Sequence, residues 1–102
     1  MKFVVKAISL ESNIFYFMRG LGYHFLSRND ADLEMNFVKP IGRGGYPRFH
    51  AYVKIMPKDK ELFFNLHLDQ NRPVYKGATA HQGEHDSELV KEEAERIKKL
   101  TI

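Results

Sequence analysis

The sequence predicts an α+β domain built on a mostly antiparallel sheet of about five strands, in the order β-α-β-β-β-β-α with both helices on one face. Residues 48–56 and 62–69 alternate apolar and polar side chains, which is the period-two pattern of strands. Residues 87–100 repeat apolar side chains at the spacing of a helix. The length of 102 residues fits one domain that covers 1–102.

Composition limits the class of protein. Apolar residues make up 43% of the chain and aromatic residues 13%, which is enough material for a core. The absence of cysteine excludes disulfides, thiolate metal sites and a cysteine nucleophile, and we therefore expect a cytoplasmic protein. No apolar stretch approaches the ~20 residues of a spanning helix, so we expect no membrane partner.

The first elements follow from residue spacing. Residues 2–9 are apolar on both sides of an extended chain, which predicts a strand buried on both faces. Residues 13–20 have helical spacing, with Ser12 as the N-cap and Gly20 or Gly22 as the stop.

A hairpin follows, formed by residues 23–28 and 33–38 around the turn-forming residues 29–32. Two prolines and three glycines then predict an irregular loop over 39–47. The residues predicted for the core face of the hairpin are Leu33, Met35 and Phe37.

The strands 48–56 and 62–69 have a predicted register in which paired residue numbers sum to 117, because this places apolar residues opposite one another throughout. The apolar pairs are Phe49–Leu68, Ala51–Leu66, Val53–Phe64 and Ile55–Leu62. The opposite face then carries Arg48, His50, Tyr52 and Lys54 across from Asp69, His67, Asn65 and Phe63.

Residues 70–85 show neither period and predict a long loop, a kind of segment that is often functional. The last helix is capped by Asp86. Its apolar stripe consists of Val90, Ala94 and Ile97, flanked by Leu89 and Leu100. We interpret its charges as a solvated face with the pairs Glu92–Arg96 and Glu95–Lys99, and assign it no function.

Basic charge gathers in the middle of the chain, where residues 39–60 contain six basic residues and one acidic residue, Asp59. Such a region attracts phosphate, and rings beside it stack on bases. The preferred hypothesis is a small nucleic-acid-binding or regulatory domain, with Phe63 either stacking on a base or covered by the loop at Val74 and Tyr75. Its candidate residues are Arg43, Arg48, His50, Tyr52, Lys54 and Phe63, with Tyr46 and the amides of Gly42, Gly44 and Gly45 as further phosphate contacts.

A second hypothesis is a metal-binding protein or a metal-dependent hydrolase. Histidine with one carboxylate suits zinc or another divalent metal. The candidate ligands are His50, His67, Asp69, His81 and His85. A metal-free variant uses His50 and His67 as acid and base on a phosphodiester. A binding protein is the preferred expectation over an enzyme, since no nucleophile motif is present.

A third hypothesis is an interaction module that pairs a sheet edge or face with another protein or with a second copy in a homo-oligomer. Three segments of the C-terminal half, 48–50, 64–70 and 75–81, followed by the acidic helix, resemble short uncharacterised bacterial proteins. The resemblance implies a self-standing short protein. It implies no activity.

Overall fold

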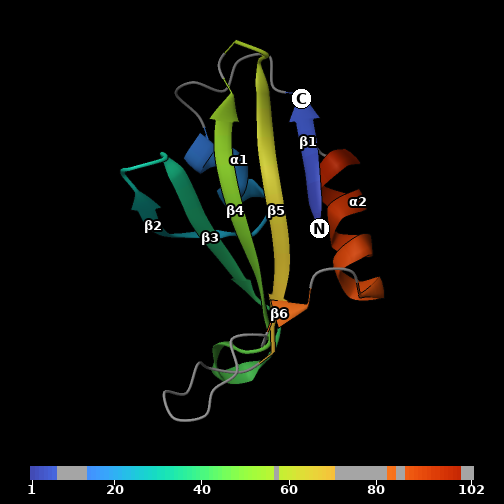
Figure 1. Ribbon diagram of the computed structural model, residues 1–102. Coiled ribbons are helices and arrows are strands. Elements are labelled where there is room, and N and C mark those ends of the chain that lie inside the picture. Colours follow the sequence, from blue (N-terminus) through green and yellow to red (C-terminus); the bar gives the residue numbers. More distant parts are fainter. Residues whose placement is uncertain (7–13, 57, 71–82, 85–86, 100–102) are drawn as a thin grey trace.

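The computed structural model describes residues 1–6, 14–56, 58–70, 83–84 and 87–99, with the backbone alone for 83–84. Its elements are β1 (Lys2–Lys6), α1 (Ile14–Gly20), β2 (His24–Asn29), β3 (Glu34–Pro40), the 3-10 turn η1 (Arg43–Gly45), β4 (Arg48–Met56), β5 (Glu61–Asp69), β6 (Gly83–Glu84) and α2 (Glu88–Lys99). This order confirms the predicted α+β pattern (Figure 1).

One antiparallel sheet joins all the strands, and five of them have the spatial order β1-β5-β4-β3-β2. The short β6 pairs with the last two residues of β5, Leu68 and Asp69, whereas β1 pairs with its first five. The register between β4 and β5 is the predicted one, from Arg48 opposite Asp69 to Met56 opposite Glu61. The match follows from the period-two alternation, because a slip of one residue would turn the apolar face toward water.

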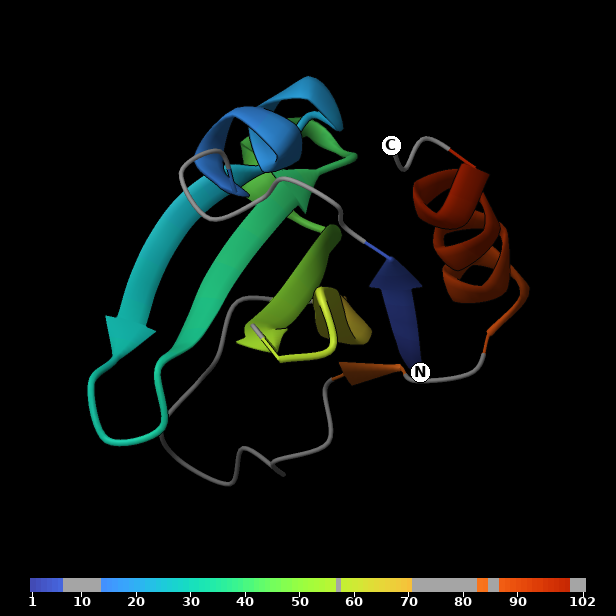
Figure 2. The same cartoon turned by 90° about the horizontal axis from the view of Figure 1, so that it is seen from above.

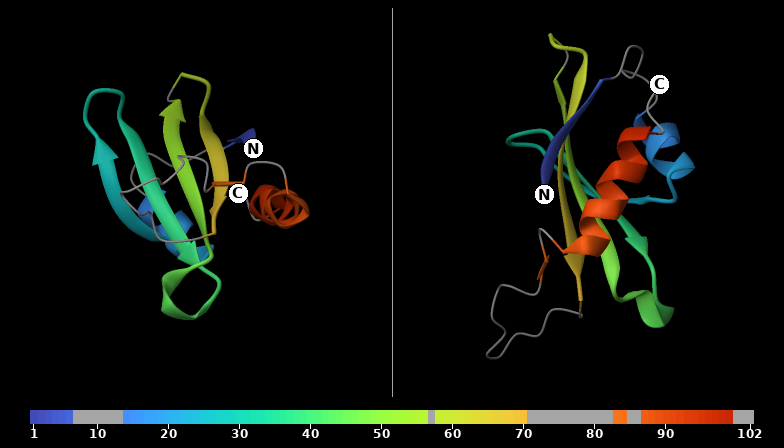
Figure 3. Two further views of the ribbon diagram at one scale, coloured as in Figure 1. Left: turned by 60° about the horizontal axis from the view of Figure 1, so that its bottom comes forward. Right: turned by 90° about the vertical axis from the view of Figure 1, so that its right-hand side faces the viewer.

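Both helices pack on the same face of this twisted sheet, as the views from above and from the side show (Figures 2 and 3). Antiparallel sheets with one packed face alternate buried and more accessible side chains, and β5 alternates buried with partly buried side chains along its whole length. The core residues of the strands are Phe3, Val5, Met35, Phe37, Phe49, Ala51, Val53, Leu62, Phe64, Leu66 and Leu68; those of the helices and the α1–β2 turn are Ile14, Met18, Leu21, Tyr23, Val90, Ala94 and Ile97.

The turn between α1 and β2 depends on Gly22, whose φ of 97° is favourable only for glycine. The Gly22 amide donates to the carbonyl of Arg19, and the Tyr23 amide donates to the carbonyl of Met18. The turn thereby directs the Tyr23 side chain into the core, where it is 2% exposed.

A buried carboxylate connects this turn to α2. The Tyr23 hydroxyl donates to Glu93 Oε2 at 2.7 Å, and Arg96 donates to both Glu93 oxygens at 2.8 Å. Arg96 also donates to the carbonyl oxygen of Leu21 at 2.7 Å. Burial raises the pKa of Glu93, but the bonds from Arg96 and Tyr23 outweigh it and hold that pKa below its ordinary value. Burial and the Glu93 charge raise the pKa of Tyr23, so its hydroxyl remains a donor.

Several details correct the sequence-based predictions. Glu93 is 5% exposed, so the charges of α2 are not all on a solvated face. The ion pairs formed on α2 include Glu93–Arg96 and Glu95–Lys98, at i,i+3 spacing, and the described contacts do not include the predicted i,i+4 pairs. Val4 is 44% exposed, because β1 is an edge strand with one face outside the core.

Leu33 was predicted in the core and is 61% exposed, since its φ of 60° places it in the β2–β3 turn. The predicted loop 39–47 contains the end of β3 and the turn η1, and the predicted loop 70–85 contains β6. Ser12, Asp86 and Leu100 lie outside the described residues; the Ser87 hydroxyl accepts from the Val90 amide at 3.3 Å, as a cap of α2. None of the described helices combines the length and apolarity needed to cross a membrane.

We expect Glu93→Gln to lower the free energy of unfolding at neutral pH and to reduce its dependence on acid. A carboxylate whose pKa is lower in the folded state stabilises the protein above its ordinary pKa, and this contribution disappears as the pH falls through the folded-state pKa. The difference between wild type and variant should therefore shrink on acidification. Denaturant unfolding at pH values from about 7 down to about 3 measures it.

Glu92→Gln is the matched control, since Glu92 is the exposed neighbour of Glu93 on the same helix. Identical pH profiles for the two variants would contradict the assignment of this role to Glu93. Tyr23→Phe should cost about 1.5–3 kcal/mol, the usual contribution of a hydrogen bond to a charged group.

Candidate functional site

The sheet face opposite α1 and α2, called the outer face below, carries the residues in which the sequence indicated chemistry. No helix of the described chain covers this face (Figure 3). From β4 it presents Arg48, His50, Tyr52 and Lys54, which lie opposite Asp69, His67, Asn65 and Phe63 of β5, as predicted. Asn36 of β3 and Lys2 and Val4 of β1 extend the face on its two sides.

Asp69 is the centre of a hydrogen-bonded group at one end of this face. Its Oδ2 lies 3.2 Å from Arg48 Nε and 3.1 Å from His50 Nδ1. Burial raises the pKa of Asp69, but the hydrogen bond and charge of His50 and those of Arg48 outweigh it, so the pKa lies below its ordinary value. Asp69 is therefore ionised at neutral pH.

The ionised carboxylate determines how His50 is protonated. A carboxylate only accepts hydrogen bonds, so His50 Nδ1 must carry a proton and donate it to Asp69. The other nitrogen, Nε2, lies 3.1 Å from Oδ1 of Asn36. Asn36 either accepts from a doubly protonated ring or, with its amide turned over, donates to a neutral one. His50 is only 8% exposed. Both of its ring nitrogens therefore need protein partners, and Asp69 and Asn36 supply them.

A row of planar groups continues from this network along the face. The ring of Tyr52 stacks on His50 with centroids 4.3 Å apart and planes at 9°. The ring of His67, which lies opposite His50 on β5, is 5.2 Å from the Tyr52 ring and tilted by 50° to it. Burial and the charges of Asp69 and Glu34 raise the pKa of Tyr52, so its hydroxyl stays protonated. At the end of the row, the Arg48 guanidinium lies 4.7 Å from the ring centroid of Tyr46.

The positive charge of the region is more balanced than the sequence count indicated. Arg48 faces Asp69, and Lys54 Nζ lies 4.0 Å from Asp32 Oδ2. Both counterions lie outside the segment 39–60, so a count within that segment could not include them. The outer face therefore attracts phosphate less strongly than six adjacent basic residues would.

The glycine loop holds Arg43 in η1, the short turn that comes just before β4 (Figure 1). Gly44 and Gly45 have positive φ angles of 78° and 90°. The Gly42 amide donates to the carbonyl oxygen of Pro47 at 3.3 Å, and a Cβ on Gly42 would lie 2.6 Å from the carbonyl oxygen of Tyr46. The Gly42 amide is thus used within the loop and does not suit a phosphate contact, which corrects that prediction.

For the metal hypothesis, the structure brings together His50, His67 and Asp69, while His81 and His85 lie outside the described residues. Within the described part of the chain, no three histidine or carboxylate side chains are grouped closely enough to hold a metal. Nδ1 of His50 is bonded to Asp69 and Nε2 to Asn36. Metal coordination by His50 would require one of these bonds to break.

For the interaction hypothesis, β2 is the edge of the sheet beyond β3, and all of its residues are exposed. A bulge between Phe25 and Ser27 interrupts its pairing with β3. Bulges make an edge less suitable for pairing with another strand. Pairing of this edge with a second chain stays a prediction.

Asn36 is the residue of the site that the sequence did not indicate. It follows from the β3–β4 register, in which Asn36 lies opposite Tyr52 and so beside His50. Comparison of the chain with protein-family models, with curated proteins and with solved structures finds no match.

We expect the neutral form of His50 to carry its proton on Nδ1. Long-range ¹H–¹⁵N correlation spectra at alkaline pH report which nitrogen is protonated. Asp69→Asn removes the ionised acceptor and should lower the population of this tautomer. His24, which is exposed on β2, serves as an internal reference within the same spectra. A wild-type ring protonated mainly on Nε2 would contradict the assigned network.

Proposed function

We propose that the domain binds single-stranded nucleic acid across the outer face. The observation that carries the proposal is the position of Phe63, an aromatic residue on the otherwise polar face of β5. Phe63 lies directly between Lys54 of β4 and Val4 of β1. Val4 is 44% exposed, so an apolar surface next to a cation is open to solvent. A base stacked there would bury apolar area while its phosphate meets the lysine.

The width of the face supports binding of more than one nucleotide. Tyr52 lies opposite Asn65, and Asn65 in turn lies opposite Lys2. The face thus offers a second ring, an amide able to bond a base edge and a second cation beside the Phe63 position. Unpaired bases are required, because the rings of a sheet surface reach base faces only where the bases are not stacked in a duplex.

The partial neutralisation by Asp69 and Asp32 sets the expected salt dependence. If Lys2 and Lys54 each contact one phosphate, log K should fall against log salt with a slope of about −1.4 for a single strand. This is a modest slope, so most of the specificity for single strands would come from stacking. Arg43 would add to the slope only for a strand long enough to reach η1.

We expect Phe63→Ala to weaken binding of a fluorescently labelled mixed-sequence single strand by about 1–3 kcal/mol, the contribution of one stacked base. Fluorescence anisotropy measures the affinity. Tyr16→Ala is the matched control, since Tyr16 is 72% exposed on α1 and lies on the other face of the sheet. Equal losses for the two variants would contradict the assignment of the outer face.

We expect Lys54→Glu to weaken binding and to lower the magnitude of the salt slope by about 0.7. Lys91→Glu makes the same charge change on the exposed side of α2 and should leave the slope as in wild type. A duplex of the same length should bind more weakly than the single strand. The proposal fails if wild type shows no anisotropy change at low salt.

A further inference from the structure

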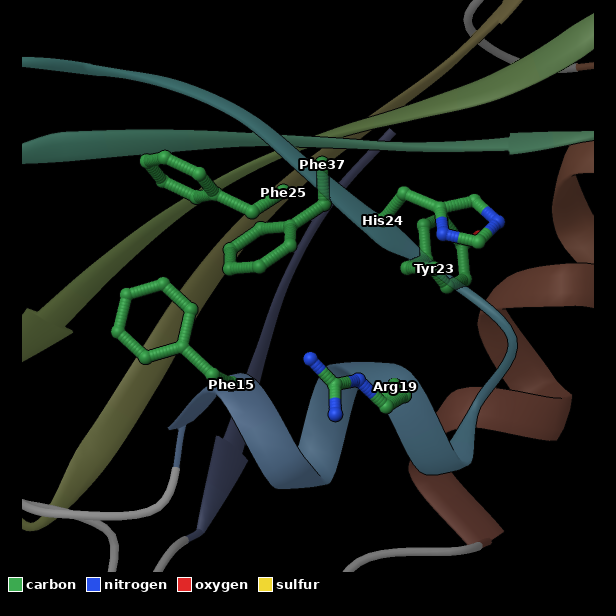
Figure 4. Close-up of a pocket in the computed structure, with 6 residues that line it drawn as sticks. All are labelled: Phe15, Arg19, Tyr23, His24, Phe25 and Phe37. Carbon is green, nitrogen blue, oxygen red and sulfur yellow. The ribbon is translucent and has the colours of Figure 1, made fainter.

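A second candidate site lies on the helix side of the sheet, between α1 and the hairpin of β2 and β3. A cavity of about 270 Å³ opens there (Figure 4). Its lining residues are Phe15, Arg19, Tyr23, His24, Phe25 and Phe37. Phe15, Arg19, Tyr23, Phe25 and Phe37 do not contribute to the outer face, whereas His24 pairs with Val38, which lies opposite His50, and so falls on the outer side of β2.

One wall of the cavity is aromatic. The rings of Phe15 and Phe25 meet edge to face at 5.3 Å, and Phe37 lies 6.1 Å from Phe15 and 5.7 Å from Phe25. Phe37 is a core residue at 1% exposure, whereas Phe15 and Phe25 are each 48% exposed. These rings, two of them half exposed and held against a buried third ring, form an aromatic edge of the cavity against which a ring can pack.

The other wall is polar and positively charged. Figure 4 shows the Arg19 side chain extending from α1 into the space between the helix and the strands, with Tyr23 and His24 beyond it. Among the residues that the structure describes, the Arg19 guanidinium has no ion pair or hydrogen bond, whereas Arg28 and Arg96 each bond a carboxylate. A guanidinium beside an aromatic cavity is suited to bind a planar anion in a bidentate manner.

Tyr23 lines the cavity with a side chain whose position is fixed by the protein itself. Its hydroxyl donates to Glu93 at 2.7 Å on the α2 side, so the cavity is lined by its ring. The position of Tyr23 therefore depends on the buried network and not on a ligand. Arg19 is then the charged group of the cavity that remains for recognition.

We propose that this cavity binds a small organic acid with one planar aromatic body and one carboxylate. The carboxylate would bond the Arg19 guanidinium, while the aromatic body packs against Phe15, Phe25 and Phe37. The volume of about 270 Å³ lies just below the usual range of ligand sites, which begins at about 300 Å³, and this favours a body of one or two rings over a long chain.

The test is a ¹H–¹⁵N correlation titration of the full chain with indole-3-acetate and, separately, with indole-3-acetamide. The two probes share their shape and differ in charge. We expect saturable shifts at the amides of α1 and β2 with the acid, and at least about tenfold weaker binding of the amide, because a bond to an ionised partner is lost. Acid and amide binding with equal affinity would overturn the proposal.

Arg19→Gln should weaken binding of the acid by at least about tenfold and leave the affinity for the amide unchanged. Arg28→Gln is the matched control, since Arg28 lies on β2 outside the cavity and pairs with Asp30. Unchanged binding of the acid by the Arg19 variant, shifts confined to the outer face, or no shifts up to the solubility limit would each overturn the proposal.

Discussion

The arrangement of the domain depends on one buried carboxylate, that of Glu93. Placing an ionised group in a core is costly unless its oxygens are bonded, and here Tyr23 and Arg96 supply the bonds. Arg96 in turn bonds the carbonyl of Leu21 in the turn after α1. The network thus connects α2 to the start of β2, although the two are far apart in the sequence. It holds the two helices on the same face of the sheet.

Because both helices lie on one face, the two faces of the sheet have different surroundings. The inner face is closed by apolar packing except at the hairpin of β2 and β3, where the seven-residue helix α1 leaves two phenylalanine rings half exposed. The outer face has no helix above it in the described structure, and its side chains satisfy one another laterally through Asp69, His50 and Asn36. The positions of the helices therefore determine which parts of the sheet remain accessible, and the two candidate sites lie in those parts.

The sequence predicts most of the sheet and only part of the chemistry. The alternation along 48–56 and 62–69 determines the β4–β5 register, and with it the neighbours on both faces. The role of Asn36 depends on the register between β3 and β4, and neither strand pattern specifies that register. Glu93 had a signal that the charge pattern obscured, since it lies three residues after Val90 and four before Ile97 and so shares their buried stripe.

The charge balance of the outer face bears on what kind of ligand suits it. Asp69 pairs with Arg48 and bonds His50 at one end, and Asp32 lies near Lys54 at the other. A ligand recognised mainly by its charge would have to compete with these carboxylates. A ligand that stacks needs only an accessible apolar surface, and Phe63 beside the half-exposed Val4 provides one. This is why we propose unpaired bases as the ligand of the face, in preference to a bare phosphate or the backbone of a duplex.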